Sequence, residues 1–278
     1  MLNNDIIRKI ESFVYHQPRS IDEIAKFIGK NWRTADRYVQ SIEKDYGTIS
    51  TKIFREGSRG ALKLVFWASV EKASKSAFQE NLEADILKGR KKEDFAGFDI
   101  FQHVQNDKKK AHIEYSTRED FSDLEQFSDV MRSTKKQLLI FSGNLSFSNL
   151  KNKDIDLFKM MEELVKKNIS IKIICRIDMA GLENIERVLS LNFKYGKELI
   201  EIHHKEQPLR AVIADNRLMT IKEIKEPTGK MHELNKRMFI FYNIKDKEWC
   251  EWLSRIFWKM FSSSIDANKR IEEMHKVK

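Results

Sequence analysis

The sequence contains few cysteines and no long apolar run. Only two cysteines occur among its 278 residues, and neither Cys175 nor Cys250 has the neighbours that a zinc site or a disulfide framework requires. No apolar run approaches the length that spans a membrane, and the polar first residues take up a helical period at once, unlike a signal peptide. We therefore expect a cytoplasmic protein without a membrane partner, a metal site or a cofactor.

The composition is that of a globular protein with an excess of positive charge. Charged residues make up 33% and hydrophobic residues 41% of the chain, which excludes an intrinsically disordered protein. A length of 278 residues allows two domains, each with its own core. The formal net charge of +9 favours a polyanionic partner, although surface lysines also serve solubility.

The positive charge is concentrated near the start of the chain. Residues 1–68 contain twelve Lys and Arg against eight Asp and Glu, and eight of the twelve basic residues lie between Lys30 and Lys63. The excess therefore falls on one short region, which contains the helices and strands considered next.

Residues 20–46 predict two short helices joined by a tight turn. Ser20 and Asn31 are suited to cap the first and the second helix, and Gly29 is suited to the turn between them. The period of the apolar residues in both segments is that of a helix. This stretch therefore predicts a helix-turn-helix.

The second of these helices has two different faces. Its apolar face carries Ala35, Val39 and Ile42, which predicts a core contact. The opposite face carries arginine, tryptophan and amide side chains, which a core helix does not need. Arginine and amide side chains are the donors that reach phosphates and purine edges in a major groove.

Two strands are expected next, at residues 48–54 and 61–67, and a glycine-rich hairpin tip with two arginines joins them. Helix, turn, helix and basic hairpin in this order resemble a winged helix-turn-helix domain, which implies double-stranded DNA as the partner. The side chains expected to contact DNA are Lys30, Asn31, Trp32, Arg33, Arg37, Gln40, Arg55 and Arg59. The alternative is a small three-helix unit that docks onto the rest of the protein or onto another protein.

The segment after the hairpin predicts a helical linker. Residues 70–89 have a loose helical period, and residues 88–92 form a basic, glycine-containing break that is typical of a hinge. We expect a DNA-binding domain at residues 1–69, a helical linker or dimerisation segment at 70–110 and a second domain at 111–278.

The second domain predicts an α/β fold. Residues 137–141 and 169–175 are apolar, strand-like runs with a helix between them at about 150–167, which is a βαβ unit. The expected fold class is therefore α/β, with a mixed sheet covered by helices. Further strands are expected at residues 198–202, 210–214, 218–224 and 238–242, and an aromatic closing helix at 246–263.

A Ser-Gly-Asn turn at residues 142–144, a hairpin that ends at Asp215 and the aromatic closing helix resemble one repeat of the phospholipase D fold. A winged helix placed before such a domain is similar to the TrmB-like group of archaeal transcription regulators. Active phospholipase D members carry His-x-Lys-x4-Asp, in which the histidine attacks the phosphodiester. With Asp215 at the motif's aspartate, Pro208 stands at the nucleophile and Arg210 at the lysine. The resemblance thus implies a degenerate domain with no catalytic residue.

The same resemblance implies a binding scaffold and a dimer. Asn144, Arg210 and Asp215 would lie near the former catalytic site, where they would hold a small anionic or sugar-like effector. Active members place two repeats face to face, and this chain has room for one. A homodimer is therefore expected, which suits paired half-sites on DNA.

The sequence thus predicts a dimeric, sequence-specific DNA-binding transcription regulator that is not an enzyme. Two alternatives stay open. One is a nuclease or phosphodiesterase of the same fold with an atypical nucleophile, such as His203 or His204. The other is a protein-interaction module.

Overall fold

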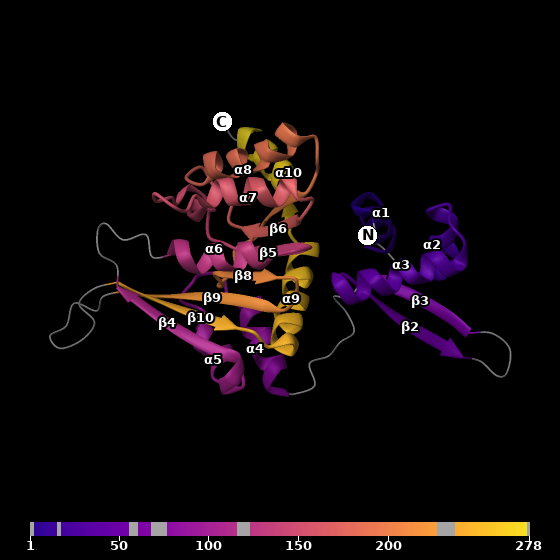
Figure 1. Cartoon of the computed structure of the whole chain (residues 1–278), viewed down its shortest axis with the longest axis horizontal. Helices are drawn as coiled ribbons and strands as arrows, with labels where there is room; N and C mark the ends of the chain where they lie inside the picture. The colour runs from indigo at the N-terminus through magenta and orange to yellow at the C-terminus, as the bar shows by residue number, and fades with distance from the viewer. Residues whose placement is uncertain are drawn as a thin grey trace. The chain divides into compact units, whose positions relative to one another are not determined.

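The computed structural model describes residues 3–15, 18–55, 61–67, 77–115, 123–226 and 237–276 (Figure 1). The chain divides into two compact units, Met1–Ser74 and Lys75–Lys278. Each unit has its own core and is described by itself below.

The first unit combines helices with a small antiparallel sheet. Its elements are α1 (Asn4–Tyr15), β1 (Arg19–Ser20), α2 (Ile21–Phe27), α3 (Trp32–Asp45), β2 (Ile49–Arg55) and β3 (Ala61–Trp67). Among the described residues of this unit, the strands form one 3-stranded sheet in the order β1-β3-β2. The two helices and the two paired strands of residues 20–67 are those that the sequence predicts.

The predicted helix ends of the first unit are confirmed. Ser20 and Glu23 form a capping box at the start of α2, and the Asn31 side chain accepts a hydrogen bond from the Thr34 backbone N–H at the start of α3. Gly29 has a φ of +64°, which glycine adopts without the steric cost of a side chain. The turn between α2 and α3 is therefore encoded locally.

A single apolar core holds the first unit together. Ala35, Val39 and Ile42 of α3 are fully buried, and they pack in one cluster with residues of α1, α2 and the sheet. Glu43 ties the other end of α3 to β2, because its carboxylate accepts hydrogen bonds from the Ser50 hydroxyl and from both the backbone N–H and the hydroxyl of Thr51. The orientation of α3 on the sheet is thus fixed at several points.

The second unit is an α/β domain, as the sequence predicts. In the part of it that the structure describes, one 8-stranded sheet has the order β11-β7-β6-β5-β8-β9-β10-β4. Strands β5, β6 and β7 are parallel, and the other pairs are antiparallel. The strands are β4 (Lys109–Tyr115), β5 (Gln137–Phe141), β6 (Ser170–Cys175), β7 (Ile200–His204), β8 (Ala211–Ala214), β9 (Leu218–Lys225), β10 (Met238–Ile244) and β11 (Ile265–Asp266).

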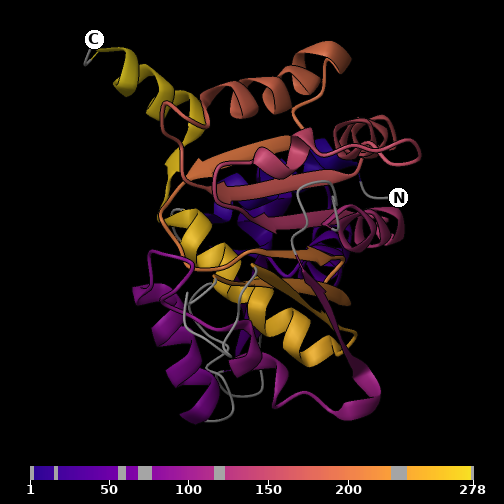
Figure 2. The same cartoon turned by 90° about the vertical axis from the view of Figure 1, so that its left-hand side faces the viewer.

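Helices cover both faces of this sheet. One face packs against α6 (Asp123–Ser133), α7 (Leu157–Lys166) and α8 (Leu182–Tyr195), whose apolar residues form one cluster with Leu138 and Ile140 of β5. The other face packs against α9 (Lys247–Ser262), where the rings of Phe141 and Phe257 lie 5.1 Å apart. Figure 2 shows α9, in gold, running across the strands. All five residues of β5 are buried, as expected of a strand covered on both sides.

The region expected as a linker is divided differently in the structure. The helices α4 (Ala77–Lys88) and α5 (Gly97–Phe101) belong to the second unit. A Cβ atom added at Gly97 would lie 2.9 Å from a methyl carbon of Ile221 and 3.0 Å from the ring of Tyr242, so α5 packs tightly on β9 and β10. The described part of residues 70–110 therefore belongs to the second domain, with α5 on the sheet and α4 against α9, where Glu83 pairs with Lys259.

Several element boundaries also differ from the predicted ones. Helix α7 begins at Leu157 instead of about residue 150, because Asp156 caps it and a short 3₁₀ helix precedes it. The apolar period of the sequence predicts a helix at residues 182–189, whereas α8 continues to Tyr195. Strand β11 and the last helix, α10 (Ala267–Lys276), were not predicted. Within the described ranges, no helix combines the length and the apolar character needed to cross a bilayer.

Candidate functional site

The predicted DNA-contacting residues of α3 and its preceding turn lie on the surface of the first unit. The indole of Trp32 is 48% exposed. The exposed residues of this face are Lys30, Asn31, Trp32, Arg33, Arg37 and Gln40. Because Ala35, Val39 and Ile42 fill the core, the helical period turns Arg33, Arg37 and Gln40 outward together. Trp32 is exposed as the first residue of α3, and Lys30 and Asn31 precede the helix. We call this set the α3 face.

Neighbouring side chains organise the α3 face. The Asp36 carboxylate forms an ion pair of 2.6 Å with Lys63 of β3, and it accepts a hydrogen bond of 2.8 Å from the Gln40 amide. The Arg37 guanidinium lies 5.7 Å from the centre of the Tyr38 ring. Among the described residues, no carboxylate forms an ion pair with Arg33 or Arg37, so their donors remain available to an external anion.

The two predicted contacts in the hairpin are not placed. Arg59 lies outside the described residues, and only the backbone of Arg55, at the end of β2, is described.

In the second unit, the loops that follow the parallel strands meet at the carboxyl ends of these strands. Gly143 and Asn144 follow β5, Arg176 follows β6, and Arg210 comes just before β8. The Arg210 guanidinium packs on Gly143, where an added Cβ atom would lie 3.0 Å from its Nη2. Ligands of open α/β sheets commonly bind at these carboxyl ends. We call these four residues the Arg210 cluster.

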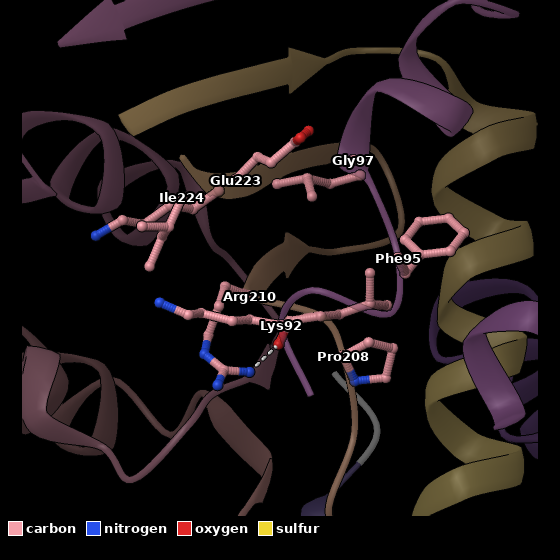
Figure 3. Close-up of a pocket in the computed structure, with 10 residues that line it drawn as sticks. Lys92, Phe95, Gly97, Pro208, Arg210, Glu223 and Ile224 are labelled. Atoms are coloured by element: carbon pink, nitrogen blue, oxygen red, sulfur yellow. Dashed lines mark hydrogen bonds between the residues drawn. The ribbon is translucent and has the colours of Figure 1, made fainter. Parts of the chain in front are cut away.

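The positive charge of Arg210 is partly buried and poorly neutralised. Its Nη1 donates a hydrogen bond of 2.7 Å to the carbonyl of the adjacent Leu209, which Figure 3 shows as a dashed line. Burial lowers the pKa of Arg210, and the nearby charge of Arg176 lowers it further. Arg176 itself pairs with Asp178 at 2.7 Å. Among the described residues, no carboxylate forms an ion pair with Arg210, so a bound anion would relieve this unbalanced charge.

The space beside Arg210 is small. A recess with room for about one water molecule adjoins the guanidinium (Figure 3). Its lining includes Lys92, which forms an ion pair of 2.7 Å with Glu226. The recess does not enclose an organic effector, so such a molecule would have to lie over the edge of the sheet.

Asn144 lies in the Arg210 cluster, and its side chain has local contacts. Its Oδ1 accepts a hydrogen bond of 3.3 Å from the Ser146 backbone N–H, and its carbonyl accepts one of 3.1 Å from the Asn184 amide. Within the described ranges, the backbone N–H groups of Gly143 and Asn144 donate no hydrogen bond. They are therefore two further donors near Arg210 that an anion can use.

Asp215 does not join this cluster. It follows the far end of β8, about 16 Å from Arg210 along an extended strand. Its carboxylate accepts hydrogen bonds of 2.8–3.0 Å from the backbone N–H groups of Lys135, Lys136 and Gln137, and its side chain is only 5% exposed. The expected grouping of Asp215 with Asn144 and Arg210 is therefore wrong. Asp215 instead ties the turn between β8 and β9 to the start of β5.

Backbone contacts hold the two histidines considered as nucleophiles. His203 stacks on Phe261 at 3.7 Å between ring centres, and its Nδ1 lies 3.0 Å from the Phe261 carbonyl. His204 accepts a hydrogen bond of 2.9 Å at Nδ1 from the Ile177 backbone N–H. Burial lowers the pKa of both residues. A structural role accounts for both contacts.

Sequence reasoning missed Gly143 and Arg176 as members of the cluster. Arg176 comes directly after β6, so the rule that parallel strands end at one edge was enough to place it beside Asn144. No signal in the sequence indicates that Gly143 supports a guanidinium. Within the residues that the structure describes, no group of three His, Cys, Asp or Glu side chains is placed to hold a metal ion.

Comparisons with known proteins give distant structural likenesses. No protein-family model and no curated protein sequence matches the chain. The archaeal chromatin protein TrmBL2, whose structure shows a novel mode of DNA binding, is 12% identical, with 95% of each chain covered and a TM-score of 0.39. Nuc, a phospholipase D family member from Salmonella typhimurium, is 12% identical over 57% of this chain and 97% of its own, with a TM-score of 0.39. NucT from Helicobacter pylori is 12% identical over 57% of this chain and 99% of its own, also with a TM-score of 0.39.

Replacement of Asp215 tests its structural role. We expect Asp215→Ala to lower the unfolding free energy of the second unit by about 3 kcal/mol. The reason is that the backbone N–H groups of Lys135, Lys136 and Gln137 lose the charged acceptor of their hydrogen bonds. Urea unfolding followed by circular dichroism measures the loss. The matched control is Asp129→Ala on the exposed side of α6, with an expected change within about 0.5 kcal/mol. Equal stabilities of the two variants would contradict the assignment.

Proposed function

We propose that the protein is a sequence-specific regulator of transcription that binds double-stranded DNA through the α3 face. The observation that carries this proposal is the joint exposure of Trp32, Arg33, Arg37 and Gln40 on a helix whose other side is locked in a core. Arginine forms bidentate hydrogen bonds with guanine and glutamine with adenine, and both need a helix held in a fixed orientation.

The N-terminal end of α3 is suited to enter the major groove. Arg33 and Arg37 are separated by one helical turn and lie on the same side, where they can reach neighbouring base edges or phosphates. Lys30 and Asn31 precede the helix and lie beside its N-terminal N–H groups, which favour a phosphate. Contacts to bases and to the backbone are thus both available from one short segment.

The second unit has a non-catalytic role in this proposal. Pro208, which stands where the resemblance places a nucleophilic histidine, is buried and has no group that can attack phosphorus. We infer that the unit brings two copies of the chain together, so that two α3 faces read two half-sites.

Removal of two arginines tests the DNA-binding face. We expect Arg33→Ala combined with Arg37→Ala to weaken binding to a duplex selected from a genomic pool by at least about thirtyfold, because each arginine supplies contacts worth about 1–3 kcal/mol. The slope of log affinity against log salt should become shallower by about 2 if both arginines contact phosphates. Fluorescence anisotropy between about 50 and 200 mM salt measures the affinity and its salt dependence. Over this range, the affinity of a protein with about 6–10 phosphate contacts falls by about 10³–10⁵-fold.

The control removes the same charge elsewhere. Lys9→Ala combined with Lys247→Ala changes two exposed cations outside the α3 face, and we expect its affinity to stay within about threefold of the parent. A parent protein that selects no duplex, or a double-arginine variant that binds as the parent does, would contradict the proposal. Cleavage of the duplex that is lost in His203→Gln or His204→Gln would support the nuclease alternative instead.

The Arg210 cluster favours a second function, the binding of a small anionic effector, including a phosphorylated sugar. The supporting observation is the half-buried Arg210 charge beside Arg176, with two backbone N–H donors nearby. Guanidinium and backbone N–H groups together match the oxygens of a phosphate.

Inorganic phosphate tests this site. At ten times its dissociation constant, phosphate should stabilise the second unit by about 1.4 kcal/mol and raise its unfolding midpoint by about 3–5 °C. We expect Arg210→Gln to abolish the shift, whereas Arg132→Gln, which changes an exposed arginine on α6, retains it. Thermal unfolding in phosphate and in chloride at equal ionic strength measures the difference. An equal response of both variants would rule the site out.

A further inference from the structure

Strand β4 lies at one end of the sheet order, and one of its two sides is unpaired in the described structure. Strand β4 pairs with β10 over seven residues, from Lys109 opposite Ile244 to Tyr115 opposite Met238. On the other side of β4, no strand of the described residues follows in the sheet. Such an edge presents a row of backbone N–H and C=O groups that another strand can pair with.

Two features that usually prevent pairing, a β-bulge and a proline, are absent from β4, and the charges that it carries are those of Lys109, Lys110, His112 and Glu114. Residues 110–113 are exposed, and Ile113 is 53% exposed. The register with β10 is continuous, with one residue opposite one residue throughout, and β4 contains no proline. Its length and regular register make it a suitable template for a further antiparallel strand.

The charges along β4 are self-complementary. Lys110, His112 and Glu114 share one face of the strand, because side chains alternate. When two copies of β4 pair antiparallel about His112, Lys110 of each copy lies opposite Glu114 of the other. A two-fold interface repeats every contact, so this ion pair forms twice.

Glu114 also has an unsatisfied atom at this place. Its Oε1 lies 2.8 Å from Nε2 of His112. Its Oε2 is buried and has no hydrogen-bond partner among the described residues. A buried carboxylate oxygen without a donor is costly, and a lysine from a neighbouring strand would supply one.

We infer that β4 is the dimerisation strand of this protein, and that its occupant is β4 of a second copy, antiparallel and centred on His112. The two sheets then form one continuous sheet through the dimer. This inference rests on the dimer of the proposed function, and it locates the interface at β4, away from the Arg210 cluster.

Charge reversal tests the interface in the full-length chain without DNA. We expect Lys110→Glu and Glu114→Lys each to raise the dimer dissociation constant by at least about tenfold, because each places like charges opposite one another twice. An equimolar mixture of the two variants should dimerise like the parent, since every Glu then faces a Lys. The double variant Lys110→Glu with Glu114→Lys should also recover the dimer. Sedimentation equilibrium measures all four samples.

The mixture and the double variant separate loss of the interface from loss of the fold, because a misfolded chain would not recover on mixing. Arg132→Glu, which reverses an exposed charge on α6, serves as the control and should leave the dimer intact. A monomeric parent, single variants that dimerise as the parent does, or a mixture that stays monomeric would each overturn the inference. Because no DNA is present, none of these outcomes bears on whether the α3 face binds a duplex.

Discussion

The burial of one side of α3 is the constraint on which the proposed function depends. Ala35, Val39 and Ile42 occupy the core of the first unit, and a helical period of 3.6 residues then requires Arg33 and Arg37 to point away from it. Asn31 and Glu43 fix the two ends of the helix, so its direction is set as well as its rotation. A recognition helix needs both, because bidentate contacts to bases tolerate little error in position.

The second unit follows from a different constraint. The parallel strands β5 and β6 are buried on both faces and require helices above and below them, and these helices leave the edges and ends of the sheet accessible. Two of these places have unbalanced charge. Among the described residues, no carboxylate forms an ion pair with the Arg210 guanidinium at the carboxyl ends of β5 and β6, and no donor reaches one carboxylate oxygen of Glu114 on β4. The first suits a small anion and the second suits another copy of the chain.

Much of the fold could be predicted from the sequence, because local signals agreed with the packing. Ser20, Gly29 and Asn31 mark the helix-turn-helix through caps and a turn, and the apolar run of β5 marks a strand covered on both faces. The extent of α8 and the existence of α10 could not be predicted, because their polar faces dilute the apolar period. The site was harder still. The resemblance to the His-x-Lys-x4-Asp motif placed Asp215 beside Arg210. In the structure, the extended strand β8 separates these two residues and puts them at its opposite ends.

The most direct measurement of the central claim observes Trp32 while DNA binds. Incorporation of 5-fluorotryptophan labels all five tryptophans, and the variant Trp32→Phe assigns the fluorine resonance of Trp32. If α3 enters the groove, this resonance shifts saturably over the same DNA concentrations as the anisotropy, while that of Trp252, buried in the second unit, stays in place. Saturable binding that leaves the Trp32 resonance unmoved would contradict the placement of DNA on the α3 face.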